Sequence, residues 1–113
     1  MHYVLMMCAD ESLVSSPAEL DVDPVAQHWR AEVRRRGVFV TGAQLRPVVD
    51  ATTVRVRDGE TMVTDGPFAE TKDVVGGFTI IDCADLDEAL EVAALHPYAA
   101  RGSVEVRPVW SDC

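Results

Sequence analysis

The chain has 113 residues and a formal net charge of −9, with 10 basic residues against 19 acidic ones. This length suits one compact domain, residues 1–113, and is too short for two. The acidic balance argues against direct nucleic-acid binding, because such binding depends on cations that displace counterions from the phosphates.

The first part of the chain predicts a strand, a helix and a second strand. Residues 2–8 form a short apolar run with aromatic and β-branched members, which is typical of a strand. Residues 10–23 read as a loop with room for a helical turn. Asp23-Pro24 then opens a helix, because aspartate suits the N-cap and proline suits the first helical position.

Apolar residues recur along this helix at every fourth position and predict a buried stripe of Val25, Trp29 and Val33. Gly37 ends the helix after three arginines, whose charges complement the C-terminal dipole. Residues 38–41 predict the second strand.

The remaining part predicts a hairpin, a strand, a helix and a final strand. Residues 52–57 and 60–64 alternate and are joined at Asp58-Gly59, a strong hairpin signal. Residues 77–83 form an apolar strand. Asp85 and Glu88 match a capping box, and Pro97 ends the helix. We expect this helix to bury Leu86, Ala89, Leu90, Ala93 and Ala94, and residues 103–109 to form the last strand.

The order of elements predicts a ferredoxin-like βαββαβ sandwich of the α+β class, with the hairpin as an insertion. We expect the strands 2–8 and 77–83 to lie side by side and parallel in the middle of the sheet. Cys8 and Cys83 end these strands and would then lie close together.

The first strand is apolar on both faces, with Tyr3, Leu5 and Met7 on one and Val4, Met6 and Cys8 on the other. Two helices cover only one face of a sheet, and isolated monomers rarely expose the other as a large apolar surface. We therefore expect a homodimer in which two sheets pack face to face and enclose a cleft.

The cysteines are three in number, without CxxC spacing, which predicts neither a disulfide framework nor a zinc ribbon. No basic leader or apolar run of about 20 residues is present, so we expect a cytoplasmic protein without a membrane partner. The histidines lack metal-ligand spacing, and Gly76-Gly77 precedes a strand and is explained by close backbone packing. We expect no metal and no cofactor.

The segments "TTVRVRDGETMVTDGPFAETKDVVGGFTIIDCADLDEALEVAALHP" and "GSVEVRPV" resemble the DGPF branch of the YCII-related domain family, and the match extends from "YVLMMCADES" to the last strand. The resemblance implies a dimeric α+β barrel. Some YCII-like proteins act on small molecules, with an enzymatic role inferred from a His–Asp pair. Proteins of the DGPF branch are associated with alternative sigma factors.

The His–Asp pair of the family can be compared with this chain residue by residue. In simpler YCII proteins it joins a histidine on the first helix to the aspartate of a D-P-Y stretch after the second. Here that stretch reads His96-Pro97-Tyr98, so a histidine replaces the aspartate, and His28 on the first helix does not fit the family spacing from Gly37. The dyad of the family is therefore not intact.

Asp65 is the first catalytic candidate, because it stands where a strand gives way to a turn and a carboxylate there can serve as a general base. The alternative is structural: Asp-Gly-Pro readily forms an Asx turn, in which the carboxylate accepts nearby backbone N–H groups. Gly66 would then supply unusual backbone angles, and Phe68 would pin the loop to the core.

His96 and His28 are the further catalytic candidates, because a histidine in a cleft can shuttle protons near neutral pH. An Asp65–His96 pair would replace the missing dyad. The alternative for His96 is that it ends a helix and complements its dipole.

The candidate substrate-binding residues are Asp10, Phe68, Glu70, Lys72 and Tyr98. Lys72 is the sole lysine, yet the neighbouring Glu70 and Asp73 favour a solvated ion pair over a nucleophile. The sequence thus supports two hypotheses: a cofactor-free acid–base enzyme for an unknown small molecule (proton transfer, elimination or hydrolysis), or a non-catalytic binding module in a regulatory setting.

Overall fold

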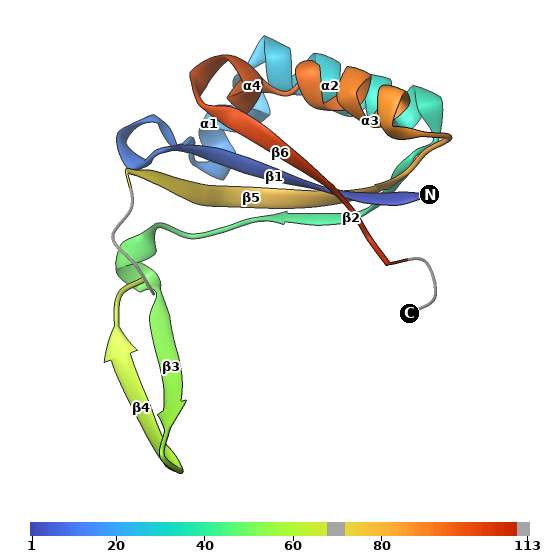
Figure 1. Cartoon of the computed structure of the whole chain (residues 1–113). Helices are drawn as coiled ribbons and strands as arrows, with labels where there is room; N and C mark the ends of the chain where they lie inside the picture. The colour runs from blue at the N-terminus through green and yellow to red at the C-terminus, as the bar shows by residue number, and fades with distance from the viewer. Residues whose placement is uncertain (68–71, 111–113) are drawn as a thin grey trace.

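The computed structural model describes residues 1–67 and 72–110 and shows a four-stranded sheet, helices on one of its faces, and a projecting hairpin (Figure 1). The elements are β1 (His2–Asp10), η1 (Glu11–Leu13), α1 (Pro17–Val22), α2 (Pro24–Arg36), β2 (Phe39–Gln44), η2 (Val48–Asp50), β3 (Thr52–Arg57), β4 (Glu60–Asp65), β5 (Asp73–Asp82), α3 (Leu86–Ala94), α4 (Pro97–Arg101) and β6 (Ser103–Pro108). The predicted mixed α+β class and the inserted hairpin are confirmed.

The strand order in the sheet is β2-β5-β1-β6, and every neighbouring pair is antiparallel. The prediction that β1 and β5 are parallel is therefore wrong. Each strand–helix–strand crossover returns the chain parallel to its first strand, but it skips one position in the sheet. The skipped position between β1 and β2 is filled by β5, which runs the other way.

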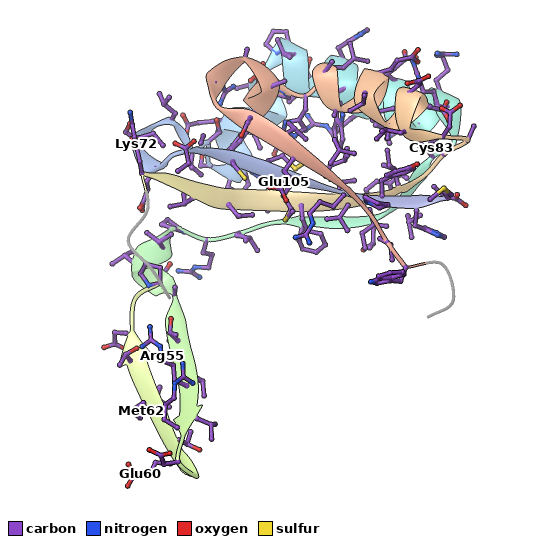
Figure 2. All side chains as sticks on the ribbon, in the orientation of Figure 1. Arg55, Glu60, Met62, Lys72, Cys83 and Glu105 are labelled. Atoms are coloured by element: carbon purple, nitrogen blue, oxygen red, sulfur yellow. The ribbon has the colours of Figure 1, made fainter. Side chains whose placement is uncertain are left out.

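This correction separates the two cysteines that we expected to be close. Cys8 is paired with Val75 near the start of β5, whereas the backbone N–H of Cys83 donates to the Met1 carbonyl at 2.9 Å. Figure 2 shows Cys83 and Lys72 at opposite ends of β5. Burial raises the pKa of both thiols, so both behave as small apolar groups rather than as thiolate nucleophiles.

The helix signals in the sequence formed as side-chain caps. Asp23 Oδ1 accepts the Val25 N–H at 2.9 Å to start α2, and Gly37 ends it with a φ of 66°. Asp85 Oδ1 accepts the Glu88 N–H at 3.0 Å to start α3. The Glu88 carboxylate accepts from Ala84 and not from Asp85, so the predicted capping box closes one residue earlier.

The buried stripes differ from the predicted ones at particular positions. Trp29 and Val33 are buried as expected, but Val25 is 51% exposed. In α3, Ala89 and Ala93 are buried together with Val92, while Leu86 and Leu90 are 47% and 48% exposed. Helix α3 is apolar on more than one side, so its packing against β6 and α2, and not its own periodicity, selects the side that is buried.

The core lies between the helices and one face of the sheet. Tyr3, Leu5 and Met7 point into it from β1 and are nearly inaccessible to solvent. Val4, Met6 and Cys8 lie on the opposite face and are only half-buried. We call that opposite side, from which the hairpin projects in Figure 1, the open face. The chain therefore covers one face of its sheet, as the count of helices predicted.

In the described part of the chain, no helix has the length and apolarity that crossing a membrane requires.

Gly102, between α4 and β6, gives a test of how tightly this fold closes. A Cβ at this position would lie 2.1 Å from the Cys8 carbonyl oxygen and 2.8 Å from the Ala9 Cα. We expect Gly102→Ala to lower the free energy of unfolding by about 2 kcal/mol or more in urea titrations, because backbone atoms cannot move aside as a side chain can. Ser103→Ala, at the exposed next position, is the control, and equal stability of the two variants would contradict the packing.

Candidate functional site

A cavity of about 200 Å³ lies between the helical layer and the β2–β5 side of the sheet. It is open to solvent on one side and is lined by residues of α1, α2 and α4 and of the strands β1, β2 and β5. Its lining residues are Met7, Leu20, Ala26, Trp29, Arg30, Phe39, Gly42, Ala43, Gln44, Gly76, Gly77, Phe78, Thr79, His96 and Tyr98. Two of the predicted site residues, His96 and Tyr98, are among them.

His96 is held in the cavity wall by its own helix cap. It is the N-cap of α4, with Pro97 at the first helical position, and its Nδ1 accepts the Tyr98 backbone N–H at 3.1 Å. Its ring also meets Trp29 edge-on, with centroids 4.8 Å apart. The prediction that His96 complements the end of the preceding helix is wrong, because α3 ends at Ala94 and His96 starts α4.

The cap decides which nitrogen of His96 carries the proton. Since Nδ1 accepts a hydrogen bond, the proton of the neutral ring is on Nε2. Desolvation, with a smaller contribution from the charge of Arg101, lowers the pKa of His96 to about 4, and the charge of Asp23 opposes this shift. The imidazole is therefore neutral at physiological pH.

The other nitrogen, Nε2, is left for a ligand. Every buried side-chain nitrogen or oxygen among the described residues has a hydrogen-bond partner, and His96 Nε2 has none there, so Nε2 is reached by solvent where the ring lines the cavity. In this tautomer Nε2–H donates a hydrogen bond. Nε2 becomes a proton acceptor only if the proton moves to Nδ1, which would break the cap.

Tyr98 forms a fixed part of the cavity wall. Its hydroxyl accepts the Ser15 backbone N–H at 2.9 Å, and its ring lies so close to β5 that a Cβ on Gly76 would be 3.2 Å from Cε2 and from the hydroxyl oxygen. The prediction that Gly76-Gly77 serves close packing is confirmed. Tyr98 is buried, and its hydroxyl is already engaged, so it shapes the cavity more than it offers a free group to a ligand.

Arg101 ties α4 to the start of α2. Its guanidinium donates to Ser15 Oγ and to Asp23 Oδ2, the latter at 2.5 Å, and lies 5.7 Å from the centroid of the Tyr98 ring. Asp23 is at the same time the N-cap of α2. One arginine thus holds together the loop before α1, the helix that carries Trp29 and the helix that His96 begins.

The charge of the cavity is opposite to that of the chain. Arg30 lines it and donates from Nη2 to the Leu20 carbonyl at 3.2 Å, whereas none of the lining residues is an aspartate or glutamate. Thr79 and Gln44 add a hydroxyl and an amide. Within residues 1–67 and 72–110, no group of three histidine, cysteine or acidic side chains could hold a metal ion.

The other predicted site residues do not line the cavity. His28 is exposed on α2. Asp65 is exposed at the end of β4, and the hairpin lies on the open face, across the sheet from the helices and His96 (Figure 1). One chain therefore does not bring Asp65 and His96 together. The predictions for Phe68 and Glu70 fall outside the described residues.

The backbone of Gly66 ties the turn after β4 to β3 and to the residue before it. Gly66 has a φ of 97°, its N–H donates to the Ala51 carbonyl at 2.8 Å, and its carbonyl accepts from Thr53 Oγ1 at 2.8 Å. The carboxylate of Asp65 accepts no hydrogen bond in the part of the chain that the structure describes. The role predicted for Gly66 is confirmed. The predicted Asx turn depends on the N–H groups that follow Pro67, which lie outside the described residues.

Asp10 is the last residue of β1, and Lys72 lies close enough to influence its charge. Asp10 accepts the Ser12 N–H at 3.0 Å and its hydroxyl at 2.7 Å, and these bonds, with a smaller contribution from the charge of Lys72, lower the pKa of Asp10. Asp10 is thus occupied as the cap of η1. Lys72 is exposed, which agrees with the solvated alternative and not with a desolvated nucleophile.

Sequence reasoning missed Arg30, Arg101 and the helix α4 that organises the site. Pro97 predicts the end of the preceding helix, although proline is also common at the first position of a new helix. Tyr-Ala-Ala-Arg after Pro97 was the available signal. No signal in the sequence pairs Arg101 with Asp23, which is 78 residues away.

Comparisons with known proteins place the chain in a family. The model of the YCII-related domain matches residues 1–111. An uncharacterised protein, R00369, of Rhizobium meliloti (strain 1021) is 40% identical over 114 residues, which cover 96% of this chain and 92% of that protein. The solved structure of 5-chloro-2-hydroxyhydroquinone dehydrochlorinase (TftG) from Burkholderia phenoliruptrix AC1100, in complex with 2,5-dihydroxybenzoquinone, is 16% identical with a TM-score of 0.48 and covers 97% of this chain and 94% of its own.

The half-buried, neutral His96 predicts a pH dependence of stability. Its pKa in the fold, about 4, is below the ordinary value of 6.5, so its contribution is complete above pH 6.5 and is lost as the pH falls through 4. The shift corresponds to about 3 kcal/mol at most. We expect the wild type to lose more unfolding free energy between pH 7 and pH 4 than His96→Asn, whose amide can keep the cap but does not titrate.

The measurement is urea unfolding at a series of pH values, with the exposed His28→Asn as the control. Equal pH dependence of wild type and His96→Asn would show that His96 is not buried in the neutral state.

Proposed function

The chain belongs to the YCII-related domain family, and we propose that it binds a small organic molecule in the cavity between the sheet and helices α2 and α4. The observation that carries this proposal is the neutral imidazole of His96, fixed by its cap with Nε2–H left unpaired in the cavity wall. Such a donor recognises an oxygen of the ligand, as a carbonyl, an enolate or another oxyanion.

In the catalytic form of this proposal, the chain is a cofactor-free enzyme for proton transfer, elimination or hydrolysis. A preorganised N–H group stabilises negative charge that develops on an oxygen in the transition state. The imidazole of His96 is already neutral, so it need not lose a proton before it acts as this donor. Asp65 remains our proposed general base. Since it lies across the sheet from the cavity of its own chain, a second copy has to deliver it.

The alternative is a non-catalytic binding module in a regulatory setting. One observation favours it: no carboxylate is among the residues that line the cavity, so the described chain has no base beside its donor. The sequence Asp-Gly-Pro-Phe at residues 65–68 supports our further proposal that the chain belongs to the DGPF branch of the family. We propose the cytoplasm as its location.

We also propose that the protein is a homodimer, joined through the open face. Val4, Met6, Phe78 and Ile80 are only half-buried there in the single chain. A second sheet packed on this face removes their apolar surface from water. Two packed sheets of this kind would form the α+β barrel that the family resemblance implies.

The first test removes the donor of His96 and keeps its cap. Asparagine can accept the Tyr98 N–H but has no group in the place of Nε2–H. A thermal-shift screen of small organic acids and carbonyl compounds should yield ligands that raise the melting temperature of the wild type and of His28→Asn, but not of His96→Asn. Ligands that stabilise all three proteins equally would contradict the proposed role of His96.

The same ligands separate the two functions. Conversion of a ligand, followed by proton NMR, supports the enzyme, and we expect His96→Asn to slow it by about 10²-fold or more. Stoichiometric binding without conversion of any ligand supports the binding module.

The dimer is tested with two variants, each of which introduces one positive charge: one on the open face and one, as the control, on the helical side. Val4→Lys places an ammonium group on the open face, whereas Val22→Lys places it on α1, where Val22 is 75% exposed. We expect light scattering to give twice the chain mass for the wild type and Val22→Lys, and the mass of one chain for Val4→Lys. A wild type that is monomeric at micromolar concentration would overturn the proposal.

A further inference from the structure

The composition of the cavity wall indicates the charge of its ligand. The chain carries nearly twice as many acidic as basic residues, yet the cavity is lined by one arginine, one neutral histidine and no carboxylate. An acidic protein repels anions in general, so a site without acidic groups is where an anion can bind. The wall therefore selects a negatively charged ligand over a cation.

Arg30 is positioned to receive this charge. One of its terminal nitrogens is engaged with the Leu20 carbonyl at 3.2 Å, which holds the side chain across the gap between α1 and α2. In the part of the chain that the structure describes, no acidic side chain forms an ion pair with Arg30. The remaining N–H groups of the guanidinium can therefore bind a planar carboxylate through two parallel hydrogen bonds.

The remaining walls suit a flat ring. Gly42, Gly76 and Gly77 contribute backbone to the wall, but a Cβ on Gly76 would meet Tyr98, and a Cβ on Gly42 or Gly77 would meet the neighbouring strand, so a ligand does not lie where their side chains would be. The rings of Trp29, Phe39 and Tyr98 supply aromatic surface. Ligand pockets commonly measure about 300–1,000 Å³, so a cavity of about 200 Å³ has room for one small ring and not for a nucleotide or a lipid chain.

We propose that the ligand of this cavity is a small monocyclic carboxylate with an unsaturated ring. Its carboxylate binds Arg30, its ring lies against the aromatic side chains of the wall, and an oxygen on the ring accepts the Nε2–H of His96. The inference rests on the proposed function and specifies the chemical class of the molecule bound.

The experiment uses four small probes with the full-length protein. Benzoate has the ring and the charge, benzamide has the ring without the charge, and cyclohexanecarboxylate has the charge without the flat ring. We expect titration calorimetry to show binding of benzoate at least tenfold tighter than that of either other probe. Salicylate, which adds a ring oxygen, should bind more tightly than benzoate, and His96→Asn should remove that gain.

Arg30→Gln should weaken benzoate at least tenfold and leave benzamide unchanged. Arg34→Gln is the matched control, since it removes the same charge one turn along α2, outside the cavity. Loss of benzoate binding in both variants to the same extent would mean that only the net charge matters and would overturn the assignment of Arg30.

The outcomes distinguish this inference from the proposed function. If benzamide binds as tightly as benzoate and His96→Asn weakens both, the small-molecule site stands and the anionic class is wrong. If cyclohexanecarboxylate equals benzoate, the flat ring is wrong. If no probe binds, at concentrations up to the millimolar range, the ligand class is overturned, while the screen with His96→Asn still decides the proposed function.

Discussion

The hydrogen bond from the Tyr98 backbone N–H to His96 Nδ1 is the interaction on which the candidate site depends. It starts helix α4, orients the imidazole and leaves the proton on Nε2. Burial then keeps the ring neutral. A residue type best known as a proton shuttle is in this way held as a hydrogen-bond donor at Nε2 and does not act as a base there in this tautomer.

The surrounding contacts explain why this donor is rigid. Tyr98 is held by the Ser15 N–H and packs on the bare backbone of Gly76, and Arg101 joins Ser15 to Asp23. These contacts connect α4, the loop before α1 and the start of α2, which are remote in sequence. Arg101 also places a positive charge near His96. The residue that connects α4 to the start of α2 therefore also disfavours protonation of the imidazole ring.

The sheet divides the molecule into two sides of different structure. The helices lie on one face of the sheet, and the hairpin projects on the other side (Figures 1 and 2). The cavity is on the helical side. Arg55, Glu60 and Met62 mark the hairpin in Figure 2, away from the helices. In the functions that we propose, the ligand binds on the helical side and the second copy packs on the open face, and Asp65 reaches a cavity only if the hairpin of the second copy extends past the edge of the sheet.

The sequence by itself determined the elements whose causes are local. Asp23-Pro24 and Gly37 delimit α2, and Asp58-Gly59 closes the hairpin, because caps and turns depend on a few adjacent residues. Only the tertiary structure decided the antiparallel pairing of β1 with β5, the distance between Cys8 and Cys83, and the set of side chains around His96. These depend on contacts between distant segments, and the residue pattern within one segment carries no information about which other segment it will meet.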